Sequence, residues 1–133
     1  MKELLQLIET NKDILTIGSA LTIDTIKYQK ELSKEKKALI PAELIDFLKK
    51  YNGIAYDLGC IYAINSEREI LPNIIDRNKN NKSTNLLYIG EDNFDYLAYN
   101  QTSNSYQIID KSDNEVLKEH KDLEEAILYI IKI

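Results

Sequence analysis

Hydrophobic and polar positions repeat with helical spacing most clearly in residues 40–53. Apolar residues recur there at i, i+4 and i+7, as Leu44, Leu48 and Tyr51. Pro41 suits the first helical position, because the N–H group that proline lacks would have no partner there. Gly53 marks the end, since glycine accepts the left-handed conformation that closes a helix. The pattern therefore predicts one well-defined helix over these residues.

Weaker patterns predict the elements around this helix. Residues 2–9 and 22–36 have helical spacing, and Thr22 or Asp24 is the candidate cap of the second segment. Residues 14–17 fit either a short strand or an extended linker, residues 60–64 fit a strand, and residues 71–77 fit a short helix. The polar run at residues 78–85 has no apolar residue to anchor it, which predicts a mobile loop.

From residue 86 onward, short apolar runs alternate with turn-forming residues. The runs cover residues 86–89, 94–99, 105–109 and 115–118, and the short gaps between them favour antiparallel hairpins over parallel crossovers. Asp122 is the candidate cap of a last helix over residues 123–131. The order predicts a single α+β domain over residues 1–133, with an antiparallel-rich, mixed sheet of about five strands flanked by helices.

Three segments also resemble a known family. Ile40-Pro41, Phe47-Leu48 and Asn52-Gly53 match a proline-led helix with a Phe-Leu centre and an Asn-Gly end, while residues 87–99 resemble a second conserved block and residues 123–131 a closing helix. On these motifs the chain resembles the SUKH superfamily, named after a fungal cell-wall-assembly regulator and its bacterial relatives. Asn93-Phe94 stands where many relatives are glycine-rich, and the tryptophans common in the family are absent. The resemblance implies a SUKH-like fold and, as in bacterial members, an immunity protein that neutralises a cognate polymorphic toxin, frequently a nuclease.

Negative charge is concentrated in the second half of the chain. The net charge is −5, and ten acidic residues face three lysines between Glu91 and Glu125. Such a surface repels phosphate backbones and attracts basic proteins, so we expect a protein partner and no direct nucleic-acid binding. The longest apolar run, residues 126–131, is too short to cross a bilayer, and the first residues lack the pattern of a secretory signal. We therefore expect a cytoplasmic protein with no membrane partner, of undetermined oligomeric state.

Catalytic and metal-binding chemistry has few candidates. His120, the only histidine, fits a surface or turn position, and Cys60, the only cysteine, begins an apolar strand as buried unreactive thiols do. Glu91, Asp92 and Asp95 could cluster around a divalent ion, whereas residues 110–115 lack the central glycine of a calcium loop. We therefore predict no enzymatic activity, no cofactor and no metal, and keep a small metal-dependent hydrolase as an alternative.

Tyrosine is over-represented, with nine against two phenylalanines and no tryptophan. Tyr96, Asp95 and Tyr106 alternate in a way that could place a mixed aromatic and acidic patch on one face of the sheet, a composition typical of binding hot spots. We predict that the partner-binding residues are Glu91, Asp92, Asp95, Tyr96 and Asp113. The leading hypothesis is a non-catalytic immunity protein that binds a basic toxin domain directly, its carboxylates taking the place of phosphates. The alternative is a regulatory scaffold that binds host proteins.

Overall fold

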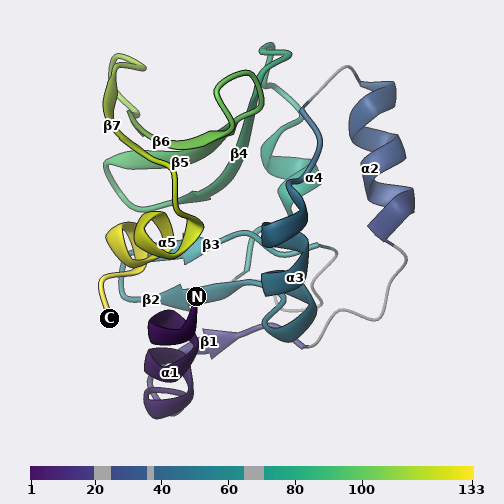
Figure 1. The fold of residues 1–133 in the computed structure, drawn as a ribbon. Helices are drawn as coiled ribbons and strands as arrows, with labels where there is room; N and C mark the ends of the chain where they lie inside the picture. Colours follow the sequence, from purple (N-terminus) through teal and green to yellow (C-terminus); the bar gives the residue numbers. More distant parts are fainter. Residues whose placement is uncertain (20–24, 36–37, 65–70) are drawn as a thin grey trace.

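The computed structural model describes residues 1–19, 25–35, 38–64 and 71–133. The predicted α+β class is confirmed (Figure 1). In chain order the elements are α1 (Lys2–Thr10), β1 (Thr16–Ile17), α2 (Thr25–Lys34), α3 (Ala42–Lys50), β2 (Ile54–Tyr56), β3 (Gly59–Ile61), α4 (Ile74–Arg77), β4 (Leu86–Glu91), β5 (Asp95–Asn100), β6 (Ser105–Asp110), β7 (Val116–His120) and α5 (Leu123–Ile131). Within the described ranges, no helix has the length and apolar character needed to cross a bilayer.

The sheet is larger and more uniform than the sequence predicted. It has seven strands in the order β1-β2-β3-β4-β5-β6-β7, and every ladder between neighbours is antiparallel. The prediction of about five strands in a mixed sheet is therefore wrong. β1 lies in residues 14–17, for which the sequence left a short strand or an extended linker open, and β2 was not predicted because its three residues are too few to show an alternating pattern. The parallel pairing in the described chain is one isolated bridge between Ala63 and Asn73.

This meander brings three turns to one end of the sheet. Because successive strands run in opposite directions, the turns β2–β3, β4–β5 and β6–β7 all lie at the end where the even-numbered strands finish. The last two turns are joined directly, since the Lys111 N–H donates a 2.9 Å hydrogen bond to the Phe94 carbonyl. We call this end of the sheet the hairpin end. Chain topology, rather than sequence proximity, gathers its residues.

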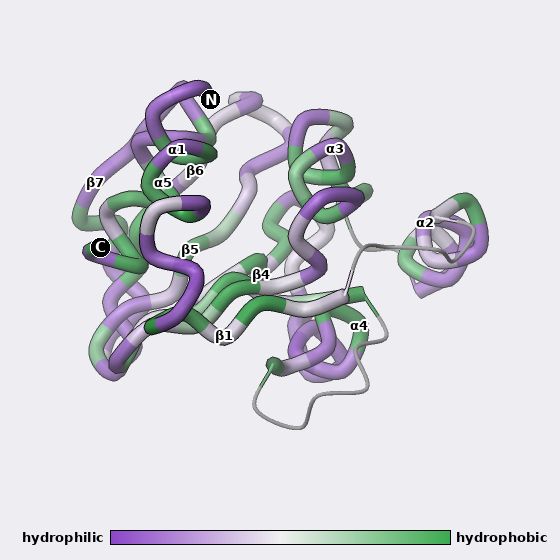
Figure 2. The backbone as a smooth tube through the Cα atoms, turned by 90° about the horizontal axis from the view of Figure 1, so that it is seen from below, coloured by the Kyte–Doolittle hydropathy of each residue, from purple (hydrophilic) through white to green (hydrophobic). Residues whose placement is uncertain are grey.

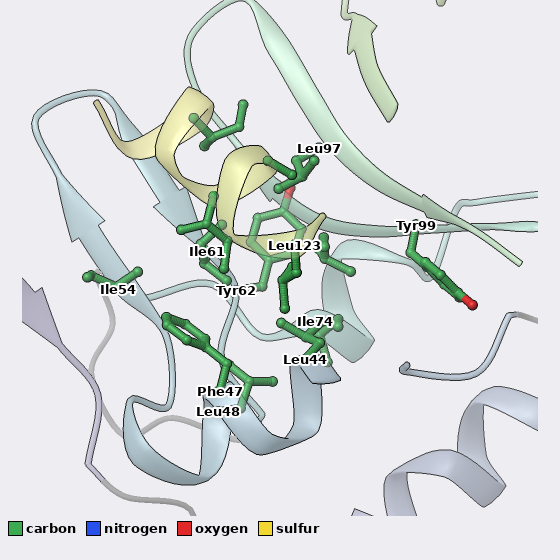
Figure 3. Packing of buried hydrophobic residues seen from close by; sticks show 14 of the residues in the cluster. Leu44, Phe47, Leu48, Ile54, Ile61, Tyr62, Ile74, Leu97, Tyr99 and Leu123 are labelled. Atoms are coloured by element: carbon green, nitrogen blue, oxygen red, sulfur yellow. The ribbon is translucent and has the colours of Figure 1, made fainter. Parts of the chain in front are cut away.

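The hydrophobic core lies between one face of the sheet and the helices. In Figure 2, α1, α3 and α5 lie on one side of β1 and β4, and α4 lies on the other side. Figure 3 shows Ile61 and Leu97 beside α5, with Leu44 and Leu48 of α3 below them, and all four side chains are fully or almost fully buried. Asp122 caps α5 as predicted, its carboxylate accepting a 2.9 Å bond from the Glu124 N–H.

The helix predicted in residues 40–53 forms as α3, with a shift at its start. Pro41 is the N-cap residue rather than the first helical residue, because its φ of −66° is combined with an extended ψ of 148°. At the other end Gly53 has a φ of +90°, the conformation expected of a helix-stop glycine. An added Cβ there would lie 2.9 Å from the Ala63 Cβ, so both the backbone and the packing require glycine.

Buried side-chain amides take the place of missing strand partners. Asn78, 0% exposed, donates to the Tyr88 carbonyl and accepts from the Tyr88 N–H, both at 2.9 Å, beside β4 where β3 no longer pairs with it. Asn52 makes the same double pairing with Ile64 at 2.8 Å. The run at residues 78–85 therefore has an anchor, contrary to the sequence prediction, and the anchor is polar. Asn81 adds a second bond, to the Leu86 carbonyl at 2.7 Å.

The second helix is described from Thr25, so its candidate caps Thr22 and Asp24 lie outside the described residues. Tyr28 and Leu32 are its buried positions. The Gln29 amide pairs with both backbone groups of Ile40, at 2.7 and 2.9 Å, which fixes α2 to the segment before α3.

Candidate functional site

The five predicted binding residues divide between the two faces of the sheet at the hairpin end. Glu91 pairs directly with Tyr96 and with Cys60, so these three side chains share one face. Asp95 precedes Tyr96 in β5 and therefore points to the other face, the one that α5 covers. The predicted single patch of Asp95 and Tyr96 is thus two surfaces. Tyr106 belongs to neither, because it is 1% exposed and its hydroxyl donates to Glu43.

The negative charge of Glu91 is paired with cations inside the protein. Its carboxylate accepts from the Tyr62 hydroxyl at 2.9 Å and from the Lys111 ammonium at 2.6 Å, and it lies 3.4 Å from Nε of Arg77. Its side chain is only 17% exposed. Two cations therefore neutralise Glu91, which leaves it little charge to offer to a basic partner.

Asp92 has a structural role in the β4–β5 turn. Its carboxylate accepts from the backbone N–H groups of Phe94 and Asp95 at 2.9 and 2.8 Å and lies 3.4 Å from the Lys132 ammonium. Burial alone would raise the pKa of Asp92, but these hydrogen bonds outweigh it and lower the pKa below its usual value. At 5% exposure, Asp92 shapes the turn and has little surface with which to contact a partner.

Asp95 is held in an unfavourable electrostatic environment. Partial burial and the nearby carboxylates of Asp92 and Asp110 raise its pKa, and Asp110 lies directly opposite it in β6. The charges of Lys132 and Lys111 favour the ionised form, but they do not outweigh burial and the two carboxylates, so the pKa of Asp95 stays raised. An incoming cation would relieve this repulsion, which makes Asp95 the predicted residue best suited to binding.

We expect the variant Asp95→Asn to be more thermally stable than the native chain at pH 7. Because the folded-state pKa of Asp95 is raised, ionisation weakens the fold as the pH rises through that value, whereas below about pH 3.9, the ordinary pKa of aspartate, the two proteins should be equally stable. Calorimetric melting temperatures between pH 3 and pH 7 test this. Asp113→Asn, which removes one charge from the same end, is the control, and an equal gain there would reject the local cause.

Two exposed apolar side chains flank a hollow at the hairpin end. Phe94 and Leu58 are 72% and 56% exposed, and they lie in the β4–β5 and β2–β3 turns. Between them is a hollow of about 200 Å³, lined also by Gly59 and the end of α5. The sequence predicted Phe94 as the first residue of a strand. The turn that Asp92 holds delays β5 until Asp95, which leaves the phenylalanine ring in solvent.

Exposed acidic side chains lie in the turns at the same end of the sheet as this hollow, and one of them, Asp57, lines it. Asp57 is exposed in the β2–β3 turn and Asp113 in the β6–β7 turn, where its carboxylate accepts the Glu115 N–H at 2.9 Å. We define the hairpin surface as Asp57, Leu58, Phe94, Asp95 and Asp113. It combines an apolar centre with a negatively charged rim, and the sequence identified two of its five residues.

A second concave site lies on the opposite face. It has a volume of about 480 Å³. Its lining consists of three tyrosines, three cationic residues and three asparagines. The tyrosines are Tyr62, Tyr88 and Tyr96, and the cations are Arg77 at the end of α4 and Lys82 and Lys111 in loops. We call it the tyrosine groove. Tyr96, predicted to bind a basic partner, belongs to this groove: its ring is 4.7 Å from that of Tyr88, and the Lys111 ammonium lies 5.0 Å from its centre.

Neither of the two residues considered for catalysis lines the hollow or the tyrosine groove. Burial, followed by the charge of Glu91, raises the pKa of the Cys60 thiol to about 11, so it stays protonated at neutral pH. His120 was predicted at the surface or in a turn, but it ends β7 with a side chain 16% exposed, its ring packed near that of Tyr129. Its Nδ1 lies 3.5 Å from a Glu125 oxygen, and its Nε2 is buried without a hydrogen-bond partner in the described chain.

The carboxylates proposed for a metal site do not converge. Glu91 and Asp95 point to opposite faces, and the oxygens of Asp92 accept backbone and lysine hydrogen bonds. Over residues 1–19, 25–35, 38–64 and 71–133, no group of three or more His, Cys, Asp or Glu side chains is arranged to hold a metal ion.

The chain was compared with family models, with curated proteins and with solved structures. None of them matches. The resemblance to the SUKH superfamily therefore stays a prediction.

Proposed function

We propose that this chain is a non-catalytic protein-binding domain that covers a basic surface of its partner with the hairpin surface. The observation that carries the proposal is the exposed ring of Phe94 beside a hollow, at the end of the sheet where three acidic turns meet. An aromatic anchor at the centre of a patch with a charged rim is the usual composition of a protein-binding hot spot.

The rigidity of the turns supports this assignment. Asp92 fixes the turn that presents Phe94, and the Lys111–Phe94 backbone hydrogen bond holds it against the next turn. A surface that is ordered before binding loses little conformational entropy on association, so more of the contact energy appears as affinity. At 72% exposure, the Phe94 ring contributes little to the hydrophobic core and is available for contact with a partner.

The acidic residues of the hairpin surface indicate the charge of the partner. Asp95 lies opposite Asp110 in β6, and burial, followed by the charges of Asp92 and Asp110, raises the pKa of Asp95. A partner rich in lysine or arginine would remove this repulsion and associate faster. A nuclease, whose substrate groove is basic, fits this description, and the SUKH resemblance supports a role as the immunity protein of such a toxin.

The test begins with the genes that flank the gene for this chain, one of which we expect to encode a secreted protein with a toxic C-terminal module. That module is then co-expressed with this chain and, once purified, used for binding kinetics. The absence of such a gene would count against the immunity role. We expect protection of growth and a direct complex. Phe94→Ala should weaken the complex by about 2 kcal/mol, or roughly 30-fold, since it removes the central anchor. It should leave the melting temperature unchanged, because the ring is exposed.

A matched pair of triple variants separates the rim from overall charge. Asp57→Asn, Asp95→Asn and Asp113→Asn together should slow association about tenfold at low salt and flatten its salt dependence. Asparagine suits position 57, where φ is +52°. Glu3→Gln, Glu35→Gln and Asp46→Asn change the net charge equally at exposed positions outside the hairpin surface, and should bind normally. Equal effects of both triples, or full binding by Phe94→Ala, would reject the proposed surface.

A further inference from the structure

The tyrosine groove is a second binding site, separate from the hairpin surface and opposite to it in charge. Its lining side chains include three cations, Arg77, Lys82 and Lys111, and no carboxylate. Glu91 is not part of the lining, but it pairs with Arg77 and Lys111 at the same time. One carboxylate against three cations leaves the groove positively charged, on a chain whose net charge is −5.

Glu91 acts as a positioning residue for the groove. Its carboxylate pairs with Arg77 at the end of α4 and with Lys111 in the β6–β7 turn, and so connects these two segments. The Tyr62 hydroxyl donates a 2.9 Å hydrogen bond to the same carboxylate. Arg77 contributes its Nε atom to this pairing while half of its side chain stays exposed. The two cations are therefore held in place before any ligand arrives, which reduces the entropic cost of binding an anion.

The rest of the lining selects for a planar ring that carries hydrogen-bonding groups. Tyr88 and Tyr96 offer an aromatic pair with centroids 4.7 Å apart, and the Arg77 guanidinium lies 5.8 Å from the Tyr62 ring. Asn80 and Asn114 add amide side chains from the two bordering loops. Aromatic rings with cations beside them stack with nucleobases, and amides pair with base edges. At about 480 Å³ the groove falls in the size range of small-molecule sites.

We propose that the tyrosine groove binds a nucleoside monophosphate, with its phosphate on Arg77, Lys82 and Lys111 and its base against Tyr88 and Tyr96. No polynucleotide is required: a single phosphate meets the local positive charge, whereas a long phosphate backbone would also meet the acidic remainder of the surface. The site is independent of the proposed function, because none of its residues belongs to the hairpin surface.

The test is isothermal titration of the whole chain with AMP, GMP, CMP and UMP at low salt. We expect at least one of them to bind, and to bind at least tenfold more tightly than adenosine, which lacks the phosphate, and than ribose 5-phosphate, which lacks the base. Absence of binding by all four, or equal binding by ribose 5-phosphate, would overturn the proposal. So would tighter binding of a hexaglutamate peptide, since that result would assign the groove to an acidic protein segment.

Two lysines provide a matched pair of variants. Lys82 and Lys79 are both exposed and lie three residues apart, but only Lys82 lines the groove. Lys82→Ala should weaken nucleotide binding about tenfold, the usual effect of losing one charged hydrogen bond, and Lys79→Ala should leave it unchanged. Phe94→Ala should also leave nucleotide binding unchanged, so this test succeeds or fails independently of the hairpin surface. Equal binding by Lys82→Ala and the native chain would place the phosphate elsewhere and overturn the assignment.

Discussion

Asn78→Ala is expected to lower the free energy of unfolding by about 3 kcal/mol, one of the two largest effects we predict. The Asn78 amide makes hydrogen bonds to the Ile74 and Tyr88 carbonyls, at 2.7 and 2.9 Å, and accepts the Tyr88 N–H at 2.9 Å. Alanine would remove these bonds and leave buried backbone groups of β4 without partners. Urea unfolding, followed by circular dichroism, measures the change.

Two further variants separate this role from ordinary packing. Asn78→Asp keeps the shape and the acceptor but loses the amide donors, and its carboxylate would face two carbonyl oxygens, so we expect at least as great a loss of stability. Asn85→Ala changes an exposed asparagine of the same loop and should be nearly neutral. A cost below about 1 kcal/mol for Asn78→Ala would show that water replaces the amide.

Gly59→Ala is expected to lower the free energy of unfolding by about 3 kcal/mol, for a steric reason. The Cβ of alanine at this position would lie 2.2 Å from the Ile130 carbonyl oxygen and 3.1 Å from its carbon, so the end of α5 would have to move away from the β2–β3 hairpin. Since the obstacle is backbone, rotation of a side chain cannot relieve it. Chemical denaturation measures the loss, and NMR amide shifts should locate the displacement at the end of α5.

The adjacent residue supplies the control for this variant. Leu58→Ala shortens an exposed side chain in the same hairpin turn and should change the free energy of unfolding by less than about 0.5 kcal/mol. Leu58→Ala alters the hairpin surface without moving α5, whereas Gly59→Ala is expected to move α5. A stability of Gly59→Ala equal to that of the native chain would mean that the hairpin and α5 separate readily.

Elements with strong periodicity could be predicted from the sequence, and their relative placement could not. The helices at Ala42–Lys50 and Leu123–Ile131, and the four strands from Leu86 to His120, follow directly from apolar spacing. The number of strands was underestimated because Ile54–Tyr56 is too short to carry a pattern of its own, and because residues 14–17 fitted a linker as well as a strand until Thr16–Ile17 paired with Ile54–Tyr56.

The candidate site was harder to predict, because charge composition does not show which charges are paired. Glu91 appears in the sequence as one of many acids, yet Arg77 and Lys111, 14 and 20 residues away, neutralise it. Asp92 was read as an open carboxylate and is the cap of its own turn. The signal that was available was Asp92-Asn93-Phe94, because an aspartate side chain commonly accepts a hydrogen bond from the backbone N–H two residues later, which favours a turn at that point.

The order of the sheet also affects when the chain can fold during synthesis. Each of the seven strands pairs only with its neighbours in sequence, so the hairpins can form one after another as they emerge. Helix α1 is the exception, since the Leu4 N–H donates to a Glu124 carboxylate 120 residues later, and α1 packs on α5. Helix α1 can therefore pack only after α5 has been synthesised, and until then the apolar side chains of Leu4 and Ile8 are accessible to chaperones.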